Sequence, residues 1–553
     1  MTLNNPEILP MESWAIVINP KLDNVAVAKK PIKAGTKVKN FDGSEIYISA
    51  DIPSGHRFAI KAIKAGEWAI QYGQRFAVSL GVNIGDPVNL DTTKSPPPPI
   101  VRPDIQLKTT ELSPWNGKIP NFRGFKRKTG LVGTRNWVLI VPTSMCSSHE
   151  AARIAMQAEM QGVYSREKYP NVDGVVAIPH SRGCGCPDLA NGSILESNII
   201  GSAEATLKIL SRYIQHPNVG AVMVIELGCE KTNLAMFERY LGKSLSPGEF
   251  QSAGSAIRDF GERWGKPVVC FSVQGSGGTS GTVRRGMEII PELLKAANLQ
   301  SRVDVPISEL GLGLKCGGSD AFSGLSANPA LGYASDLLIS AGGNSLITEI
   351  PEFLGAEHLF AERAVNREVV EKIVAAMERY QAYTQRAGIN MAENPSPGNK
   401  AGGLINITIK SLGALAKSGT APVQGVLDYG EFVWDQPKRG LYLLYSPGYD
   451  QESTPAEVAS GCQVVCFTTG RGTGIGNAIA PVIKIASNTS LYEKMTGDID
   501  INAGTVIDGV KTIEEVGKQI FDLVIEVASG KWVKAEENGH REFAIWSEQG
   551  ISL

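Results

Sequence analysis

The chain contains 553 residues, of which 42% are hydrophobic and 20% are charged, and its formal net charge at pH 7 is −2. A chain of this length exceeds what one hydrophobic core supports, so we expect about two to four domains. The small net charge and the lack of a basic block argue against nucleic acid or an anionic membrane as a partner. We find no signal-peptide pattern and no apolar run of about 18 residues, so we expect a cytoplasmic protein without a membrane span.

Residues 1–95 are predicted to form a small all-β domain. Short β-rich runs such as "WAIVINP", "NVAVAKK" and "SEIYISA" alternate there with Gly, Pro and Asp, which break strands and form turns. Residues 96–123 follow as a linker that begins with four consecutive prolines. Proline runs favour extended polyproline II structure and prevent a helix, so this linker should join separate folding units.

From residue 124 onward, strand-like runs alternate with helical patterns, which predicts α/β domains with mostly parallel sheets. We assign residues 124–300 to one such domain, with strands in "NWVLIVP", "VDGVVAI" and "VGAVMVIE". Residues 301–553 are assigned to the second, with strands in "LGLKC", "LYLLY" and "VVCFTT". Ligands of such sheets bind at the carboxyl ends of the strands, so we expect a site in the polar loops after these runs.

Five of the eight cysteines stand at or near the end of an apolar run. They are Cys146, Cys184, Cys229, Cys316 and Cys466, whereas Cys270 lies inside an apolar run and is expected in the core. The spacing does not indicate a disulfide framework, and no repeated CxxC pair indicates a structural zinc. The strand-end thiols either fill small pockets or form a soft-ligand site for iron, as Fe²⁺ or as a cluster.

Three segments offer a cation to an anionic ligand. Arg135, just before a strand, either binds a carboxylate with two nitrogens or forms an ion pair. Lys400 follows "NPSPGN" and precedes a helix that we expect to start near Ile405. The N-terminal amides of that helix would favour an anion. The alternative is a helix cap with a solvated lysine. Arg471 lies in "GRGTGIG", which we do not interpret as a dinucleotide site because no ribose-binding acid follows.

Two histidines are candidates for proton transfer, because imidazole titrates near neutral pH. His56 follows a glycine in the β domain, and His180 lies at the end of a strand beside "SRGCGC". A structural role is the alternative for each of them.

Motifs spread over nearly the whole chain resemble those of the galactarate and altronate dehydratases. They include "IPSGH", "GTRN", "LGCE", "KCGGSDAFSGLSANPALGYASD", "NPSPGNKAGGL", "FTTGRGT" and "DINAGT", and the resemblance runs from about Asp23 to the C-terminus. The galactarate branch looks closer, because residues 88–93 read "VNLDTT" where the altronate branch has a histidine-rich pattern, and Ala503 stands where that branch has cysteine. The loops at 179–188 and around Cys146 differ from both branches.

The resemblance implies a β-clip (SAF-like) N-terminal domain and a metal-dependent hydro-lyase that dehydrates a six-carbon sugar acid, of the galactarate or altronate type, to a 2-keto-3-deoxy acid. It implies Fe²⁺ as the cofactor, with an iron–sulfur cluster, Mn²⁺ or Mg²⁺ as alternatives. We expect a homo-oligomer, a dimer. The alternative functions are a sulfo-lyase acting on a sulfonated 2-hydroxy acid and a non-catalytic sugar-acid sensor.

The expected site groups its residues by role. Proton transfer is assigned to His56 and His180. Substrate binding is assigned to Arg135, Ser319, Asn399, Lys400 and Arg471. The metal is assigned to Cys184, Cys229, Glu230, Cys316 and Asp320.

Overall fold

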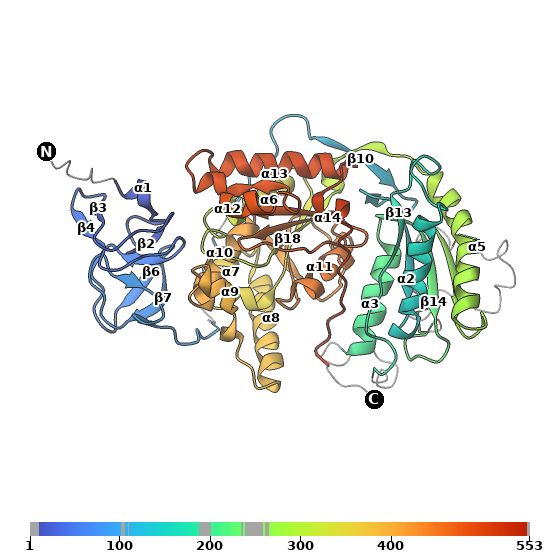
Figure 1. Cartoon of the computed structure of the whole chain (residues 1–553), viewed down its shortest axis with the longest axis horizontal. Helices are drawn as coiled ribbons and strands as arrows, with labels where there is room; N and C mark the ends of the chain where they lie inside the picture. Colours follow the sequence, from blue (N-terminus) through green and yellow to red (C-terminus); the bar gives the residue numbers. More distant parts are fainter. Residues whose placement is uncertain are drawn as a thin grey trace.

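The computed structural model describes residues 10–100, 106–108, 110–186, 201–233, 236–237, 258–259 and 265–549. In Figure 1 the N-terminal β domain lies at one end, the C-terminal α/β domain in the middle, and the second α/β domain at the other end. The predicted fold class, a small all-β domain followed by two α/β domains with mostly parallel sheets, is confirmed. Among the described residues, no helix is both long and apolar enough to cross a membrane.

The N-terminal domain consists of short antiparallel strands, as its turn-rich sequence predicts. Its four-stranded sheet has the order β1 (Ala15–Ile16), β2 (Val25–Ala28), β5 (Arg57–Ala59), β8 (Pro87–Val88). A three-stranded sheet has the order β6 (Trp68–Gln71), β7 (Gln74–Ser79), β9 (Thr93–Lys94). Strand β3 (Lys37–Lys39) pairs with β4 (Glu45–Tyr47), and helix α1 (Met11–Trp14) precedes all of these strands. All four residues of β2 are buried, because its two faces pack on different cores. Val27 packs with Ala321 and Phe322 of the C-terminal domain, which docks the β domain there.

The second domain has a five-stranded sheet with the order β13 (Gly174–Ala177), β12 (Trp137–Pro142), β14 (Val219–Glu226), β16 (Pro267–Ser272), β15 (Arg258–Asp259). All its pairings are parallel except that of β15. Helices α2 (Met145–Met160), α3 (Ser202–Gln215) and α5 (Thr279–Asn298) flank this sheet (Figure 1). A small antiparallel sheet of β11 (Val132–Gly133), β10 (Asn121–Lys126) and β17 (Val303–Pro306) joins the start of the domain to its end.

The C-terminal domain has a seven-stranded, all-parallel sheet with β18 at its centre. The strand order is β20 (Val423–Leu427), β21 (Leu441–Leu444), β19 (Asn344–Ile347), β18 (Gly311–Cys316), β22 (Val464–Thr469), β23 (Val482–Ala486), β24 (Ile501–Asn502). Its helices are α6 (Ala327–Ser340), α7 (Glu357–Ala361), α8 (Arg367–Arg386), α9 (Pro397–Ala401), α10 (Ile407–Leu415), α11 (Asp450–Ala459), α12 (Thr489–Lys494), α13 (Ile513–Ala528) and α14 (Lys534–Glu537). Helices α6 and α13 pack against each other on one face of the sheet (Figure 1).

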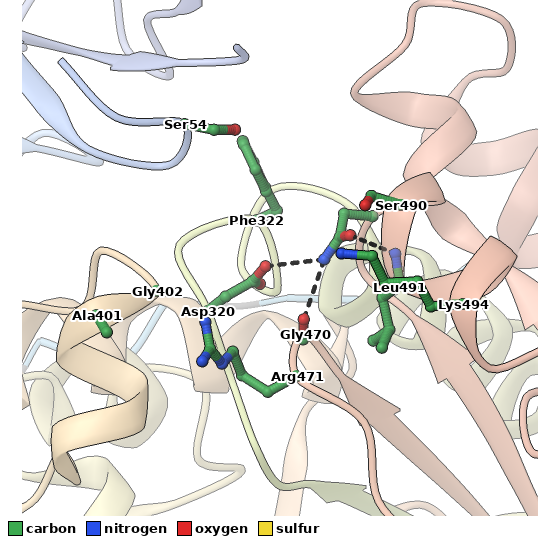
Figure 2. Close-up of a pocket in the computed structure, with 11 residues that line it drawn as sticks. Ser54, Asp320, Phe322, Ala401, Gly402, Gly470, Arg471, Ser490, Leu491 and Lys494 are labelled. Atoms are coloured by element: carbon green, nitrogen blue, oxygen red, sulfur yellow. Dashed lines mark hydrogen bonds between the residues drawn. The ribbon is translucent and has the colours of Figure 1, made fainter. Parts of the chain in front are cut away.

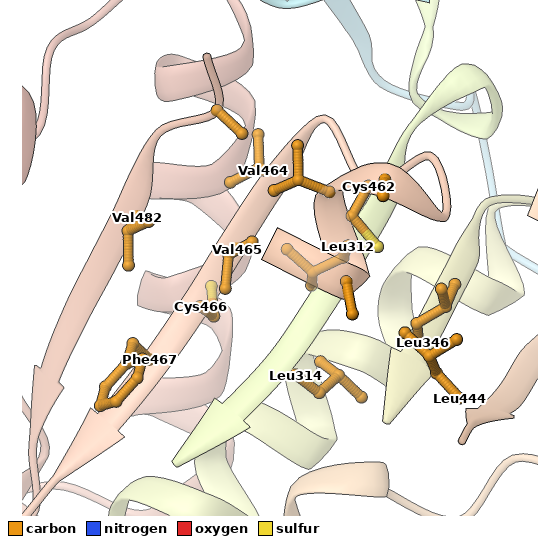
Figure 3. Packing of buried hydrophobic residues seen from close by; sticks show 14 of the residues in the cluster. Leu312, Leu314, Leu346, Leu444, Cys462, Val464, Val465, Cys466, Phe467 and Val482 are labelled. Atoms are coloured by element: carbon orange, nitrogen blue, oxygen red, sulfur yellow. The ribbon is translucent and has the colours of Figure 1, made fainter. Parts of the chain in front are cut away.

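The central strands carry apolar side chains on both faces, because helices cover both sides of a parallel sheet. Figure 3 shows Leu312 and Leu314 of β18 among Leu346, Val465 and Cys466 of the neighbouring strands. Cys466 is fully buried in this core and is a packing residue, so its interpretation as a soft ligand is wrong. Burial of Cys270 in β16 is confirmed.

Candidate functional site

A cavity of about 440 Å³ lies where the β domain meets the C-terminal domain. Three loops that follow neighbouring strands β18, β22 and β23 form most of its wall, and Ser54 faces them from the β domain (Figure 2). The residues that line it are Ser54, Asp320, Phe322, Ala401, Gly402, Gly470, Arg471, Asn488, Ser490, Leu491 and Lys494. The cavity therefore occupies the carboxyl edge of a parallel sheet, where a ligand site is expected.

The β domain closes one side of the cavity through a tight backbone contact. Gly403 has φ +94°, and a Cβ atom there would lie 2.4 Å from the carbonyl oxygen of Gly55, so only glycine fits. Arg57 donates a hydrogen bond to the carbonyl oxygen of Gly403. In the same loop, His56 Nε2 lies 3.3 Å from the carbonyl oxygen of Ala401, which lines the cavity. Burial lowers the pKa of His56, so its ring is neutral at pH 7.

Asp320 is the buried acid of the cavity, and its two carboxylate oxygens have different surroundings. Oδ1 accepts hydrogen bonds from Ser323 N, Ser323 Oγ and Ser487 Oγ, at 2.9, 3.0 and 2.8 Å. Oδ2 accepts one from Asn488 Nδ2 at 3.0 Å. Burial raises the pKa of Asp320, and these hydrogen bonds reduce the rise without cancelling it. A buried acid with a raised pKa is suited to accepting a proton.

Two cations lie at the rim of the cavity. Arg471 follows β22, and Lys494 is the last residue of α12; both are exposed at the surface. Figure 2 shows Arg471 next to Asp320 and Lys494 on the neighbouring helix. The structure thus brings predicted residues Asp320 and Arg471 together at one cavity, with His56 beside it. Lys494 was not recognised in the sequence, because a lysine at the end of a short helix carries no local signal.

A small second cavity continues from Asp320 toward the interior, and Arg57, Ser319 and Lys410 are among its lining residues. The buried hydroxyl of Ser319 has no hydrogen-bond partner among the described residues. Burial lowers the pKa of Arg57 to about 10. Its hydrogen bonds go to the side chain of Gln71 and to a backbone carbonyl, both neutral. The sequence did not identify Arg57 as a site residue, because an arginine within a strand carries no local signal of a binding site.

A buried group of charges lies behind this second cavity. Possible metal ligands are the His, Cys, Asp and Glu side chains. Among the described residues, one group of three such side chains has donor atoms that all lie within 4.8 Å of one another: Cys316, Glu349 and Glu352. They are the candidate ligands for the divalent metal that the sequence resemblance implies. Asp320 does not belong to this group, since its carboxylate points to the cavity and is bonded to Ser323, Ser487 and Asn488.

Lysine ammonium groups occupy the donor atoms of this group, however. Glu349 pairs with Lys315 and, at 2.9 Å, with Lys417. Glu352 pairs with Lys410 at 2.8 Å, and Lys417 Nζ also lies 2.9 Å from Cys316 Sγ. Burial raises the pKa of the Cys316 thiol, so it stays neutral. Lys315 also forms an ion pair with Asp450. The three lysines therefore balance the charge of three carboxylates, and the group does not fit an additional divalent cation.

Two predicted site residues have structural roles instead. Arg135 is fully buried, and its guanidinium pairs with both carboxylate oxygens of Glu536, at 2.6 and 2.7 Å. It joins the start of β12 to the C-terminal helices and is not available to a substrate. His180 Nε2 donates to the carbonyl oxygen of Pro142 at 2.9 Å, and its Nδ1 accepts from the backbone of Arg182. The assignment of His180 to proton transfer is wrong, because both of its ring nitrogens form hydrogen bonds with backbone groups.

The segment 394–403 also differs from expectation. Helix α9 begins at Pro397, so Lys400 lies in its last turn and not before a helix N-terminus. The next helix, α10, begins at Ile407 with Asn406 as its cap. Asn399 accepts hydrogen bonds from Ser396 and donates one to the carbonyl oxygen of Ser319 at 2.8 Å. Asn399 therefore ties two loops of the cavity wall together and does not itself line the cavity.

The predicted metal ligands are divided between two sheets. Cys316 and Asp320 follow β18 in the C-terminal domain, whereas Cys184, Cys229 and Glu230 follow β13 and β14 in the second domain. They do not form the single site that we expected. The cysteine set of the second domain, which includes Cys146, consists of free thiols at exposed residues. Thiolates are soft ligands, so this set fits the iron that the resemblance implies, whereas the Cys316 group does not.

Three family models match the chain. Residues 14–96 match the altronate/galactarate dehydratase SAF domain, residues 124–298 the second domain of D-galactarate dehydratase/altronate hydrolase, and residues 307–551 the C-terminal domain of D-galactarate/altronate dehydratase. An altronate dehydratase of Bacillus subtilis is 36% identical over 538 residues, which are 96% of this chain and 98% of that protein. The chain belongs to the D-galactarate/altronate dehydratase family. The predicted enzyme class, a carbon–oxygen lyase, is confirmed as well.

Two further relatives bear on the branch within this family. The galactarate dehydratase (L-threo-forming) of Escherichia coli is 35% identical, with coverage of 92% of each chain. The (2R)-sulfolactate sulfo-lyase subunit beta of Chromohalobacter salexigens is 31% identical over 77% of this chain and 96% of that subunit. Identities of 36% and 35% do not separate the altronate branch from the galactarate branch, so the closeness to the latter stays a prediction.

Proposed function

We propose that this protein dehydrates a six-carbon sugar acid, of the galactarate or altronate type, to a 2-keto-3-deoxy acid in the 440 Å³ cavity. The observation that carries the proposal is a buried acid of raised pKa beside two rim cations, in a family of dehydratases. A cavity of this size is in the ordinary range for small-molecule sites, which is about 300–1,000 Å³.

The rim cations bind the substrate. Arg471 presents a planar guanidinium that suits a carboxylate, and Lys494 offers a second positive charge on another element. The hydroxyl groups of the acid find polar partners in Ser54, Asn488 and Ser490. An acid with a carboxylate at each end uses both cations, whereas an acid with one carboxylate uses one of them.

Asp320 accepts the proton from the carbon next to the carboxylate. Its Oδ2 atom takes the proton, because Oδ1 is occupied by three hydrogen bonds. The C–H electrons form a C=C bond as the C–O bond to the β-hydroxyl breaks. In its imidazolium form, the minor form at pH 7, His56 beside the rim at Ala401 gives a proton to the departing hydroxyl, which leaves as water. The enol then takes a proton on carbon and becomes the 2-keto-3-deoxy acid.

We also propose a metal requirement. Cys146, Cys184 and Cys229 would hold the metal, since they are the described donor set that fits iron. When bound, iron would supply a Lewis acid at this sheet edge of the second domain, and no step at Asp320 is assigned to it. None of the roles given above to Arg471, Asp320 and His56 depends on where the metal lies.

A sulfo-lyase is the second candidate function. The similarity to the (2R)-sulfolactate sulfo-lyase subunit favours it, because that subunit matches 77% of this chain. A sulfonate is an anion like a carboxylate, so the same cations would bind it. The leaving group, sulfite in place of water, distinguishes the two reactions.

The test is a substrate panel with iron-loaded, anaerobically prepared protein. Galactarate, altronate, related aldarates and aldonates, and a sulfonated 2-hydroxy acid are each incubated with it, and 2-keto acid and sulfite are measured. We expect keto acid from a six-carbon sugar acid and no sulfite. No keto acid from any sugar acid would contradict the proposal, and sulfite release would establish the second candidate.

Charge-removing variants then test the binding site. Arg471→Met and Lys494→Met each lose a charge-assisted contact of roughly 1.5–3 kcal/mol, so kcat/KM should fall about 10- to 150-fold on the best substrate. The matched control is Lys518→Met, which removes an exposed lysine on α13 that pairs with Asp522. Its kinetics should equal those of the wild type. Unchanged kinetics in both rim variants would move the carboxylate site away from this cavity.

A further inference from the structure

Three exposed cysteines follow three adjacent strands of the second domain. The order β13, β12, β14 places the carboxyl ends of these strands side by side, and Cys184, Cys146 and Cys229 come after them in that order. The other five cysteines of the chain are buried. Three exposed thiols at one sheet edge form a set of soft donors that a single ligand can share.

Specific contacts join the three loops that carry these thiols. Thr232, just past Cys229, donates from Oγ1 to the carbonyl oxygens of Thr143 at 2.8 Å and Gly183 at 3.2 Å. The backbone N–H of Met145 donates to the carbonyl oxygen of Arg182 at 2.9 Å. Because Thr143, Gly183 and Thr232 lie within three residues of Cys146, Cys184 and Cys229, the three loops form one rigid edge.

Gly183 allows this close approach. Its φ is +102°, and a Cβ atom there would lie 2.6 Å from the carbonyl oxygen of Thr143 and 2.9 Å from Ser144 Cα. No other residue fits without moving the loop before Cys146. The glycine before Cys184 therefore brings that cysteine against the loop of Cys146.

Glu230 shapes the third loop and is not itself a metal ligand. Its carboxylate accepts hydrogen bonds from the backbone N–H groups of Leu227, Gly228 and Cys229, at 2.8, 2.7 and 3.0 Å. Thr143 donates to it from the neighbouring loop. Both oxygens are thus used in holding the turn that presents Cys229, which corrects the prediction that Glu230 binds metal.

The thiols themselves are arranged for a soft ligand. Cys146 and Cys184 are near enough to interact, and both are free thiols. Cys146 lies in the first turn of the 16-residue helix α2, which fixes its place at this sheet edge. The three sulfur atoms do not all lie within 4.8 Å of one another. Among the described residues, the donor atoms of Cys316, Glu349 and Glu352 do lie that close together.

We propose that Cys146, Cys184 and Cys229 bind an iron–sulfur cluster. A single tetrahedral ion with metal–sulfur bonds of about 2.3 Å would draw all three sulfurs to roughly 4 Å from one another, closer than they are here. A cluster spans more widely spaced thiolates, and cysteine thiolates are its usual ligands. Three protein ligands on a four-iron cluster leave one iron open to a ligand from outside the protein. This inference deepens the metal requirement proposed above and rests on it, but its test measures bound iron, sulfide and thiol protection and not turnover.

The test uses the full chain, reconstituted anaerobically with ferrous iron and sulfide and then desalted. We expect about four iron and four sulfide per chain, with the broad visible absorption and the electron paramagnetic resonance signal, after reduction, of a cluster. Cys146→Ser, Cys184→Ser and Cys229→Ser should each lower bound iron about tenfold or more. Cys270→Ser, in the core strand β16, is the control for loss of a thiol outside the site.

A second measurement does not depend on the folding of variants. Wild-type protein is treated with iodoacetamide before and after reconstitution, and the labelled cysteines are identified by mass spectrometry. We expect all three thiols to be labelled in the apo protein and protected in the reconstituted protein. Labelling that reconstitution leaves unchanged, iron binding that survives all three substitutions, or one zinc per chain without iron would each overturn the proposal.

Discussion

The side chain of Asn488 joins Asp320 to the loop after β22. Its Nδ2 atom donates to Asp320 Oδ2 at 3.0 Å and to the carbonyl oxygen of Gly470 at 3.1 Å. Asn488 itself follows β23, so one amide group links the loops of three neighbouring strands. This arrangement fixes the direction of the Asp320 carboxylate before a substrate arrives, and such preorganisation is what a catalytic acid or base needs.

Asp320→Asn tests the role of this carboxylate. The amide keeps the size of the side chain and an oxygen for Ser323 and Ser487, but it cannot accept a proton. We expect kcat to fall by about 10²- to 10⁴-fold, the usual contribution of a general base. The new NH₂ group faces the Asn488 Nδ2 donor, so the melting temperature should also fall somewhat. The matched control, Asp522→Asn on the surface of α13, should keep full turnover. If the asparagine variant turns over like the wild type, the base lies elsewhere.

The fold could be predicted from the sequence because strands and helices are encoded locally. The run "VGAVMVIE" is fully buried as β14, and the turn-rich N-terminal region forms antiparallel strands. Parts of the site could not be predicted, because they depend on partners distant in the chain. Arg135 and Glu536 are 401 residues apart, and no local pattern shows that the carboxylate of Glu536 already occupies the arginine.

The cysteines illustrate the same limit. Their positions after apolar runs predicted strand ends correctly for Cys146, Cys184 and Cys229, but the sequence does not say which strands are neighbours. Cys316 was grouped with them, although it belongs to another sheet and contacts Lys417. Sheet order, and not local sequence, decides which strand ends share a site.

Gly403→Ala tests whether the docking of the β domain supports turnover. The new Cβ atom would meet the backbone of Gly55, and φ +94° is unfavourable for alanine. We expect kcat/KM to fall at least tenfold as the loop of His56 moves away from the cavity. Gly388→Ala is the control, because Gly388 also has positive φ, +72°, but a Cβ atom added there would have no other atom within 4 Å. Equal activity of both variants would show that the β domain need not dock tightly.

Lys417→Met tests the interpretation of the Cys316 group as a metal-free ionic network. The substitution leaves the buried carboxylates with one cation too few, and breaking a buried ion pair costs roughly 3–5 kcal/mol. Adding Glu349→Gln to this variant removes the uncompensated charge, so the double variant should lose less than the sum of the two single losses. Urea unfolding measures this, and addition of a chelator should leave all midpoints unchanged. A chelator-dependent midpoint that disappears with Glu349→Gln would instead indicate a metal bound there.

His180→Gln tests the neutral state of this buried ring. Burial lowers the pKa of His180 to about 4, and the backbone N–H of Arg182 points at its Nδ1, which cannot accept that bond once protonated. The unfolded chain takes up this proton below pH 6.5, whereas the folded chain takes it up near pH 4. The stabilisation by neutral His180 is therefore complete above pH 6.5 and is lost as the pH falls to about 4, by roughly 3 kcal/mol. Glutamine does not titrate, so the difference in free energy of unfolding between wild type and variant should shrink over this interval. Urea midpoints at pH 7, 5.5 and 4 measure it, and their comparison cancels the titration of groups common to both proteins. A constant difference over the whole interval would show that protonation of His180 does not oppose folding.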